Sequence, residues 1–317
     1  MKIFITGIAG FIGSNLAEKL NALGADVVGV DSFEDYYNPK FKRHTAKILE
    51  KQGIKVYELN LCSDDLSKAL EDSKVIYHIA AQPGNDAKTP FDNYVKNNIY
   101  ATYNLLNQVK NLKTLKSFIN IATSSVYGFY ATSSESETPL PVSPYGITKL
   151  AAEHLVMSER RNNGFPACSC RLFSVFGKRE RPDKLYPKLI KALDNDTKFP
   201  LFDGSLEHTR SFTNIEDIVD GLILVLNKWD KAEGEIFNLG TDEQSTTKEG
   251  IEIAEKLFNK KLKIDLLPKR LGDQIATHAN IKKINDILGY TPKVSLKEGL
   301  ENMIHWYLSE VKGIVEY

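Results

Sequence analysis

Residues 2–13 read KIFITGIAGFIG, and this stretch decides the fold of the chain. Lys2 to Thr6 is a short apolar run, which is typical of a strand buried on both faces. Gly7, Gly10 and Gly13 follow at the spacing G-x-x-G-x-x-G, and a helical pattern begins directly afterwards. Glycines so placed let the chain turn tightly, approach a pyrophosphate and pack the helix on the strand, while the helix N-terminus offers free N–H groups. The stretch therefore predicts a nucleotide-binding turn rather than a purely structural one.

The same alternation of strand and helix continues through the first half of the chain. Buried strands are predicted at 25–30, 55–59, 75–79, 116–121 and 167–172, and helices at 14–23, 41–51, 90–109 and 144–160. Elements that alternate in this way form a parallel sheet with helices on both faces. We therefore predict an α/β fold in which residues 1–175 form a Rossmann-like, doubly wound parallel sheet that binds the cofactor.

After about residue 175 the pattern changes. Charged and proline-containing segments dominate 178–208. Beyond them the sequence predicts a strand at 235–239, a helix at 248–258, a strand at 262–268 and a helix at 296–311. This mixture predicts a smaller α+β substrate domain in residues 176–317, with returns to the sheet near 209–240.

Composition excludes several classes of protein. The 317 residues include 41 Lys plus Arg and 41 Asp plus Glu, and this neutral balance gives no case for nucleic acid or an anionic membrane as partner. No apolar run is long enough to cross a membrane, and the apolar N-terminus is interrupted by Thr6 and by glycines, unlike a signal peptide. We expect a cytoplasmic protein. Cys62, Cys168 and Cys170 complete no zinc pattern, so we expect no metal.

Asp31 ends the second predicted strand, eighteen positions after Gly13. A carboxylate at this place accepts hydrogen bonds from the adenosine ribose hydroxyls and repels a 2′-phosphate, which favours NAD over NADP. The alternative is a solvated acidic residue at a strand end.

Tyr145 and Lys149 stand four residues apart in a predicted helix, so they share one helix face. An ammonium beside a phenol favours the phenolate and lowers the pKa of the tyrosine, which makes it a general base for a hydroxyl group. A second element supports the pair, because the strand at 116–121 runs into Thr123, Ser124 and Ser125. Hydroxyl groups at the carboxyl end of such a strand lie where open α/β sheets bind ligands.

Ten motifs now stand in a recognisable order from the first residues to about residue 290. They are TGIAGFIG, VDSFEDYYNP, IYHIAAQPG, NNIYATYNLL, ATSSVYG, SPYGITKLAAE, RLFSVFGKRERPD, RSFTNIEDIVDG, FNLG and RLGDQIATHAN. The sequence resembles the extended short-chain dehydrogenase/reductase family, in its branch of NAD-dependent nucleotide-sugar epimerases and dehydratases. The resemblance implies a Rossmann domain, a smaller nucleotide-sugar domain and a homodimer formed through two helices of each subunit.

The resemblance also assigns roles to residues. It implies that Tyr145 is the base, that Lys149 tunes it and anchors the cofactor ribose, and that the Thr123 hydroxyl completes a proton relay. The implied NAD contacts are Gly7, Gly10, Phe11, Ile12, Gly13, Asp31, Asn60, Leu61, Ala80, Ala81, Asn98, Tyr145 and Lys149. Asn60 departs from the Asp that the family often has near adenine, although an amide can still accept a hydrogen bond. His78 would line the same groove, and we assign it no chemistry.

On the substrate side the resemblance implies two arginines that grip the nucleotide diphosphate, Arg210 and Arg270, because a guanidinium binds phosphate oxygens in pairs. Asp273 would hold the nucleotide ribose. The further substrate contacts that we expect are Ser124, Ser125, Ser174, Arg181 and Thr277.

The reaction follows from two positions. Related 4,6-dehydratases carry an Asp-Glu pair after the threonine of ATSSVYG, and uronate decarboxylases carry Glu where Ser125 stands. This chain has Ser124 and Ser125 there, so 4-epimerisation remains. Two alternatives stay open: a nucleotide-sugar reductase or dehydrogenase that consumes its cofactor, and a non-catalytic nucleotide-sensing protein of the same fold.

The sugar is predicted from further resemblance. DSFEDYYNPKFK, the Thr-Ser-Ser triplet and the RPD at 181–183 most resemble UDP-glucuronate 4-epimerases. Thr277 stands where UDP-galactose epimerases with narrow pockets have a bulky aromatic residue, which leaves room for a carboxylate or an N-acetyl group. Hydroxyl groups that converge near C5 and C6, with Arg181 approaching, would hold a C6 carboxylate. UDP-glucose or its N-acetyl analogue is the alternative, because GKRERPDK carries more charge than the usual segment.

Overall fold

The computed structural model describes residues 1–84, 89–269 and 276–315. Its centre is a seven-stranded sheet in the order β12-β7-β5-β4-β1-β2-β3, in which every neighbouring pair is parallel. The strands are β1 (Lys2–Thr6), β2 (Asp26–Asp31), β3 (Lys55–Glu58), β4 (Val75–His78), β5 (Ser117–Thr123), β7 (Ala167–Leu172) and β12 (Ile236–Leu239). The order reverses between β1 and β4, and open sheets bind ligands outside the carboxyl ends of the strands at such a reversal. The predicted doubly wound sheet is confirmed.

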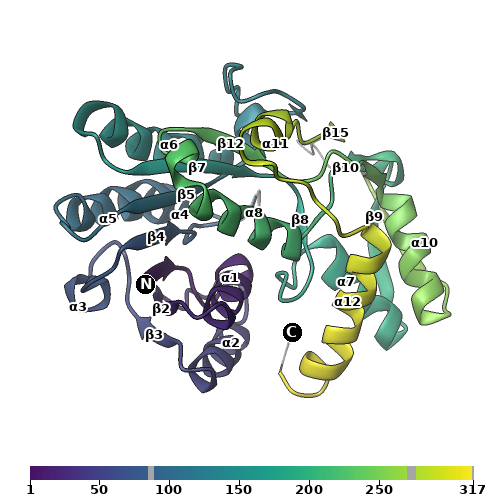
Figure 1. Cartoon of the computed structure of the whole chain (residues 1–317). Helices are drawn as coiled ribbons and strands as arrows, with labels where there is room; N and C mark the ends of the chain where they lie inside the picture. Colours follow the sequence, from purple (N-terminus) through teal and green to yellow (C-terminus); the bar gives the residue numbers. More distant parts are fainter. Residues whose placement is uncertain (85–88, 270–275, 316–317) are drawn as a thin grey trace.

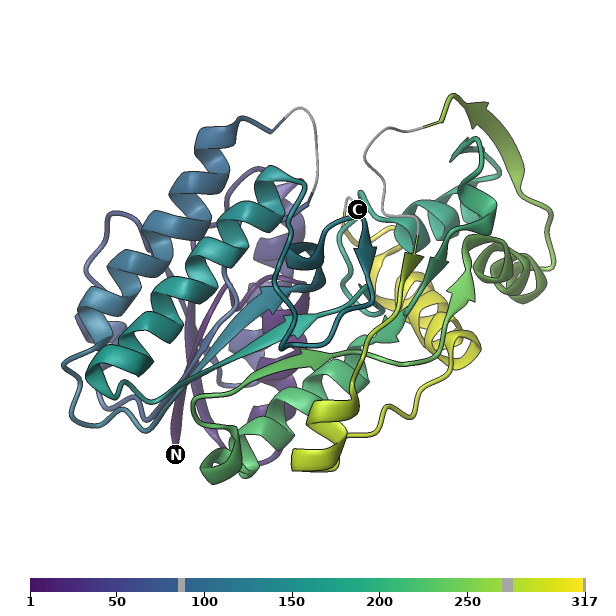
Figure 2. The same ribbon diagram turned by 90° about the horizontal axis from the view of Figure 1, so that it is seen from above.

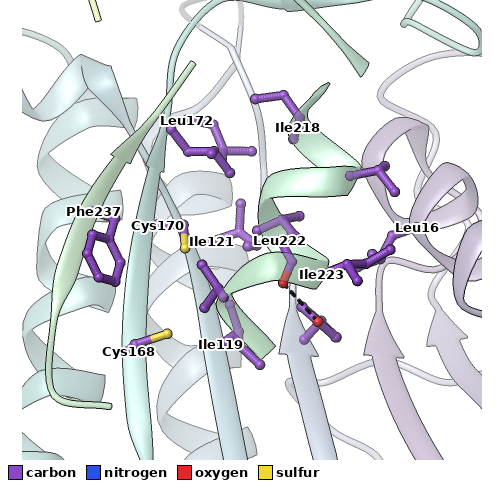
Figure 3. Close-up of a cluster of buried hydrophobic side chains, with 14 of the residues drawn as sticks. Leu16, Ile119, Ile121, Cys168, Cys170, Leu172, Ile218, Leu222, Ile223 and Phe237 are labelled. Carbon is purple, nitrogen blue, oxygen red and sulfur yellow. Dashed lines mark hydrogen bonds between the residues drawn. The ribbon is translucent and has the colours of Figure 1, made fainter. Parts of the chain in front are cut away.

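Helices cover both faces of this sheet (Figure 1, Figure 2). One face carries α1 (Phe11–Ala22), α2 (Pro39–Lys51) and α8 (Ile215–Asn227). The other carries α3 (Ser67–Leu70), α5 (Ala101–Val109) and α6 (Pro144–Asn163). Figure 3 shows how α8 packs in the core. Ile218 and Leu222 of α8 lie over the strand residues Ile121 and Cys170, and Leu16 of α1 packs on the opposite side of α8. Both faces of the strands are therefore buried, which explains their continuous apolar runs.

A smaller group of elements lies beyond the carboxyl ends of the strands. It comprises α7 (Leu185–Asn195), β9 (Lys198–Phe202), α10 (Thr247–Phe258), β14 (Lys263–Leu267) and α12 (Leu296–Trp306), which continues as a π-helical turn (Tyr307–Val311). These elements share a second hydrophobic cluster, to which α2 adds Phe41. The strands β9 and β14 pair in parallel.

Short elements join the two groups. They are η2 (Ser124–Tyr127), β6 (Tyr130–Ala131), β8 (Val175–Phe176), η3 (Ser205–Glu207), β10 (Thr209–Arg210), β11 (Thr213–Asn214), α9 (Trp229–Ala232), β13 (Ser245–Thr246), β15 (Ala276–Thr277) and α11 (Lys282–Leu288). Both α8 and β12 belong to the sheet body, as the predicted returns near 209–240 require, and α11 packs there too. The division into 1–175 and 176–317 stays a prediction.

One predicted helix has a different form. The segment expected at 90–109 is α4 (Phe91–Tyr94), a π-helical stretch η1 (Val95–Tyr100) and α5. The wider turn contains Asn98, whose side chain bonds to neighbouring segments instead of facing solvent. A π turn of this kind often accompanies a functional site, and sequence periodicity does not reveal it.

The described residues contain neither a membrane-spanning helix nor a cluster of metal ligands. No helix in the described part of the chain is long and apolar enough to cross a membrane. Within 1–84, 89–269 and 276–315, no group of three or more His, Cys, Asp or Glu side chains is placed to hold a metal ion.

Candidate active site

A cavity of about 560 Å³ opens at the carboxyl ends of β1, β2, β4 and β5 and reaches the smaller group of elements. Most of the residues selected from the sequence lie in its wall. They are Gly7, Gly10, Phe11, Ile12, Gly13, Asp31, Asn60, Leu61, Ala80, Ala81, Thr123, Ser124, Ser125, Tyr145, Lys149, Ser174, Arg181 and Arg210. Residues that follow the carboxyl ends of β1, β2, β3, β4, β5 and β7, together with residues of α6, therefore converge on one cavity.

The glycine turn at one end of the cavity has room only for glycine. A Cβ on Gly13 would lie 2.3 Å from the carbonyl oxygen of Gly7, and a Cβ on Gly7, where φ is 68°, would lie 3.0 Å from Cα of Ala80. Gly10 precedes α1, and no side chain caps the helix there. The first N–H groups of α1 thus face a backbone cradle at the cavity wall, and this arrangement fits the pyrophosphate of a dinucleotide.

Asp31 is buried at the end of β2, and its Oδ1 accepts a hydrogen bond of 2.9 Å from the N–H of Phe33. Burial raises the pKa of this carboxyl, while Lys42 and the N–H groups of Phe33 and Ala9 act in the opposite direction. Lys42 Nζ lies 4.0 Å from Asp31 Oδ1 and also lines the cavity. A carboxylate that faces the cavity with a lysine beside it fits the ribose-binding role expected of Asp31.

Asn98 lies beneath the cavity rather than in its wall. Its Oδ1 accepts from the N–H of Gln82 at 2.7 Å, and its Nδ2 donates to the Gln82 carbonyl and to Thr148 Oγ1. These bonds fix the segment that follows β4, which carries the wall residues Ala80 and Ala81. Asn98 therefore supports the wall from below.

His78 does not line the groove, contrary to expectation. It is fully buried, and its ring nitrogens bond to Thr6 Oγ1 at 2.9 Å and to Thr102 Oγ1 at 2.8 Å. Burial lowers its pKa to about 3, and the charge of Lys149 adds to the effect. A neutral imidazole with both nitrogens bonded is a structural group.

Tyr145 and Thr123 meet because the start of α6 lies against the end of β5. Ser143 caps α6 by accepting from the N–H of Gly146 at 3.1 Å. A Cβ on Gly146 would lie 2.6 Å from the carbonyl oxygen of Ser125, so only glycine permits this approach. The hydroxyl of Thr123 acts on the phenol of Tyr145 and lowers its pKa, and both side chains line the cavity. These two hydroxyl groups are therefore the candidates for proton transfer at this end of the cavity.

The electrostatics of Tyr145 differ from the expectation. Burial raises its pKa, whereas the hydroxyl of Thr123 and the charge of Arg181 lower it in part. The sequence predicted a lowered pKa with Lys149 as the cause, and both points are corrected. Helical spacing places Lys149 on the same face as the phenol, but it shows neither how deeply the phenol is buried nor that Arg181 approaches it from another segment.

Lys149 is itself buried, at 3% exposure. Burial lowers its pKa to about 8, and the nearby Glu153 carboxylate opposes this shift. A lysine with such a pKa changes its charge near neutral pH.

Arg181 places an available donor at the cavity. Its guanidinium lies over the ring of Tyr36 at 5.1 Å, and its Nη2 is 3.5 Å from Asp183. The other terminal nitrogen, Nη1, is buried without a hydrogen-bond partner among the described residues. A buried guanidinium N–H without a partner is costly, and an anionic ligand group would satisfy it.

The remaining substrate residues are placed as follows. Ser124, Ser125, Ser174 and Arg210 line the cavity, and Arg210 Nη1 donates to the carbonyl of Thr209 at 2.9 Å. Thr277 does not line it: the side chain is fully buried in β15, and its Oγ1 accepts from the N–H of Ser211 at 3.3 Å. The expectation that Thr277 shapes the sugar pocket is therefore not supported. Arg270 and Asp273 lie outside the described residues.

The cavity wall also contains residues that the sequence analysis did not select. Tyr36, Lys42, Glu180, Lys184 and Tyr186 belong to this group. Burial raises the pKa of Glu180 to about 8, against the opposing charges of Lys184 and Arg181. The stretches DSFEDYYNPKFK and GKRERPDK contain four of the five, so the signal lay in stretches already noted, without an indication of which side chains face inward.

With this geometry established, comparison with known proteins identifies the family. Residues 3–240 match the NAD dependent epimerase/dehydratase family. The chain belongs to this family. It is 35% identical to the uncharacterized UDP-glucose epimerase YtcB of Bacillus subtilis, over 99% of this chain and 100% of the relative. It is 32% identical to UDP-glucuronate 4-epimerase 4 of Arabidopsis thaliana, over 98% of this chain and 76% of the relative.

Solved structures of family members share the fold. The UDP-glucuronic acid 4-epimerase from Bacillus cereus, crystallised with UDP-glucuronic acid and NAD, superposes with a TM-score of 0.91 at 38% identity, covering 96% of this chain and 98% of that chain. The dTDP-glucose 4,6-dehydratase DesIV from Streptomyces venezuelae, with NAD bound, gives a TM-score of 0.88 at 25% identity, covering 98% of each chain. Because both reactions occur on this fold, the fold alone does not decide the reaction.

The position of Asp31 predicts the cofactor preference. The wild-type protein should bind NAD more tightly than NADP, because the carboxylate repels a 2′-phosphate. Asp31→Asn should reduce this preference by about tenfold or more, since Lys42 then faces the 2′ position without a carboxylate, and about 1.4 kcal/mol corresponds to a factor of ten. Calorimetric titration with both cofactors measures the ratio, with Glu34→Gln, also in the cavity wall, as control. A wild-type protein that prefers NADP contradicts this assignment.

Proposed function

We propose that this protein is an NAD-dependent UDP-sugar 4-epimerase whose substrate is UDP-glucuronate. The observation that carries the proposal is that Tyr145, Lys149 and Thr123 line the same cavity as the glycine turn. The relatives that are UDP-glucuronate 4-epimerases support the choice of sugar. The name of the Bacillus subtilis relative supports the epimerase reaction.

In this mechanism NAD, when bound, accepts a hydride from C4 of the sugar and returns it. The residues of the chain move the proton. Tyr145 acts as the phenolate: it takes the proton of the 4-hydroxyl through the hydroxyl of Thr123, which gives up its own proton as it receives one. When NAD is bound, its positive nicotinamide would favour this phenolate against the burial that raises the pKa of Tyr145. Lys149 adds a positive charge on the same helix face and would anchor the cofactor ribose. After the 4-keto sugar has rotated, Tyr145 and Thr123 return the proton to O4.

Ser124 and Ser125 bear on two competing reactions, elimination and decarboxylation. Elimination at C5 and C6 needs an acid or base beside those carbons, and a general acid assists the loss of CO₂ from a 4-keto uronate. Ser124 and Ser125 lie in the wall next to Thr123, and neither carries a carboxyl group. Without a carboxyl group at these two positions, we expect reduction of the 4-keto sugar to prevail.

A uronate also needs a site for its carboxylate. The hydroxyl groups of Ser124, Ser125 and Ser174, with Arg181 Nη1, supply hydrogen-bond donors in the cavity wall. A carboxylate held rigidly keeps its C5–C6 bond out of alignment with the 4-keto carbonyl, and this protects the intermediate from losing CO₂. Arg210 would bind the diphosphate, and Arg270 and Asp273 keep their proposed roles at the diphosphate and the nucleotide ribose.

One observation favours a second substrate. Glu180 is a buried carboxyl in the cavity wall, and when ionised it would repel a uronate. UDP-glucose or UDP-N-acetylglucosamine is therefore the alternative substrate of the same epimerase reaction.

The proposal includes a homodimer in the cytoplasm. The apolar side chains of Phe91, Tyr100 and Tyr103, on the α4–α5 segment, and of Ile147, on α6, are about half exposed. Helices α5 and α6 lie side by side on one face of the sheet (Figure 2). Two such helices from each subunit would bury these side chains in a dimer. The cytoplasm is where NAD and UDP-sugars are available.

A panel of UDP-glucuronate, UDP-glucose and UDP-N-acetylglucosamine tests the reaction and the sugar, with no reductant added. We expect each substrate that reacts to give its 4-epimer without accumulation of NADH, and UDP-glucuronate to show the highest kcat/KM. Mass spectrometry that finds CO₂ release or a 4-keto-6-deoxy sugar as the main outcome would contradict the epimerase reaction. A clear preference for a neutral sugar would remove the uronate assignment alone.

Tyr145→Phe tests the base. The variant should lower kcat by about 10²–10⁴-fold or more, because a general base contributes that much, while NAD still binds. Tyr130→Phe, at an exposed position, is the matched control and should keep full activity. Near wild-type turnover by Tyr145→Phe would exclude this tyrosine as the base.

A further inference from the structure

A buried ion pair lies between the central sheet and α6, one helical turn beyond Lys149. Arg171 of β7 donates from Nη2 to Glu153 Oε1 at 2.6 Å and from Nε to Glu153 Oε2 at 3.0 Å. The side chains are 3% and 1% exposed. The two parallel bonds occupy both carboxylate oxygens and fix the plane of the carboxylate.

The other polar groups around the pair are also bonded. Ser169 Oγ donates to Glu153 Oε2 at 3.2 Å, and Arg171 Nη1 donates to the hydroxyl of Tyr127 at 2.8 Å. Tyr127 in turn donates to Asn238 Oδ1 at 2.8 Å. The network joins α6 to β7, η2 and β12. Asn120 Nδ2 donates to Ser169 Oγ at 2.9 Å, while Asn120 Oδ1 is buried without a hydrogen-bond partner among the described residues. The bonds around the ion pair hold these elements in one arrangement.

Glu153 stands four residues after Lys149 on α6, so the two side chains share a helix face. No carboxylate among the described residues lies within 4.0 Å of Lys149 Nζ, and Glu153 is the carboxylate that acts on it at longer range. His78 on β4 also faces this lysine, and the imidazole of His78 is neutral. Burial alone would favour the uncharged amine, and the field of Glu153 opposes that tendency.

The role of Arg171 follows from this geometry. If Glu153 had no arginine partner, its carboxylate would form a direct ion pair with Lys149 and draw the ammonium away from the cavity. Arg171 instead takes both oxygens of Glu153, so the ammonium of Lys149 stays in the cavity wall while it still feels a negative charge one turn away.

We propose that Glu153 is a positioning residue that supplies the counter-charge for Lys149, and that Arg171 holds Glu153 in place and prevents a direct ion pair. The inference rests on the proposed role of Lys149 at the cofactor ribose, and it does not depend on which sugar reacts. It assigns to two residues outside the cavity wall a function in cofactor binding and turnover.

Three variants and a control test this inference. Glu153→Gln removes the negative charge and leaves the positive charge of Arg171. Glu153→Gln with Arg171→Met removes both charges at similar volume, which folded proteins often tolerate. Glu153→Asp keeps the charge. Glu159→Gln, on the same helix and away from Lys149, is the control.

The measurement is NAD affinity as a function of pH, from about pH 6 to about pH 10, by calorimetric titration, with circular dichroism to confirm folding. Affinity should fall as Lys149 loses its proton at alkaline pH. Removal of a nearby negative charge lowers the pKa of a lysine, so the fall should move to lower pH by about one unit in Glu153→Gln and by less in the double variant. Glu153→Asp and Glu159→Gln should leave it unchanged.

A purely structural role gives a different result. Folded variants that bind NAD more weakly at every pH, with the alkaline fall unmoved, would overturn the proposal. If Glu153→Gln does not fold, the double variant decides in the same way. The alkaline limb of kcat should follow the same order with whichever UDP-sugar the wild type converts. If the wild type converts none, the proposed function fails, and the NAD titration still decides the role of Glu153.

Discussion

The close contact between the start of α6 and the end of β5 is the constraint on which the site depends. It brings Tyr145 and Thr123 into the wall of one cavity, and it is possible because Gly146 has no side chain where Ser125 approaches. Ser143 caps the helix at this point. The rest of α6 must then hold its register on the sheet, or the phenol would shift away from the sugar. A displacement of about 1 Å at a reacting group can cost about 10² in rate.

Burial is the common cause of the pKa shifts in this site. It raises the pKa of Tyr145, lowers that of Lys149 to about 8 and raises that of Glu180 to about 8. Each shift favours the neutral form of its group, so an enclosed cavity without its ligands holds less charge than its sequence suggests. Nearby charged side chains restore part of this charge: Arg181 acts on Tyr145 from another segment, and Glu153 acts on Lys149 from the same helix. A cavity of low dielectric constant makes these charges more effective than they would be in water.

Local patterns in the sequence predicted the fold, and most of the site residues that they indicated lie in the cavity wall. The glycines from Gly7 to Gly13 and the pair Tyr145 and Lys149 lie within single segments, so spacing alone brings each set together. Properties that depend on packing between distant segments were predicted less well. Burial removed His78 and Thr277 from the wall and reversed the direction expected for the pKa of Tyr145. The pair formed by Glu153 and Arg171 joins a helix to a strand, and neither residue lies in a pattern that indicates the other.

The central claim is that the hydride leaves C4 and returns to C4 without exchange, while Tyr145 and Thr123 move only the hydroxyl proton. Conversion of UDP-glucuronate in D₂O, followed by mass spectrometry and NMR of the product, tests this claim directly. The account predicts a 4-epimer with no deuterium bound to carbon and no net change in NAD. Deuterium at C4 or C5 of the product would contradict it, because it would show that a carbon-bound hydrogen had been exchanged with solvent.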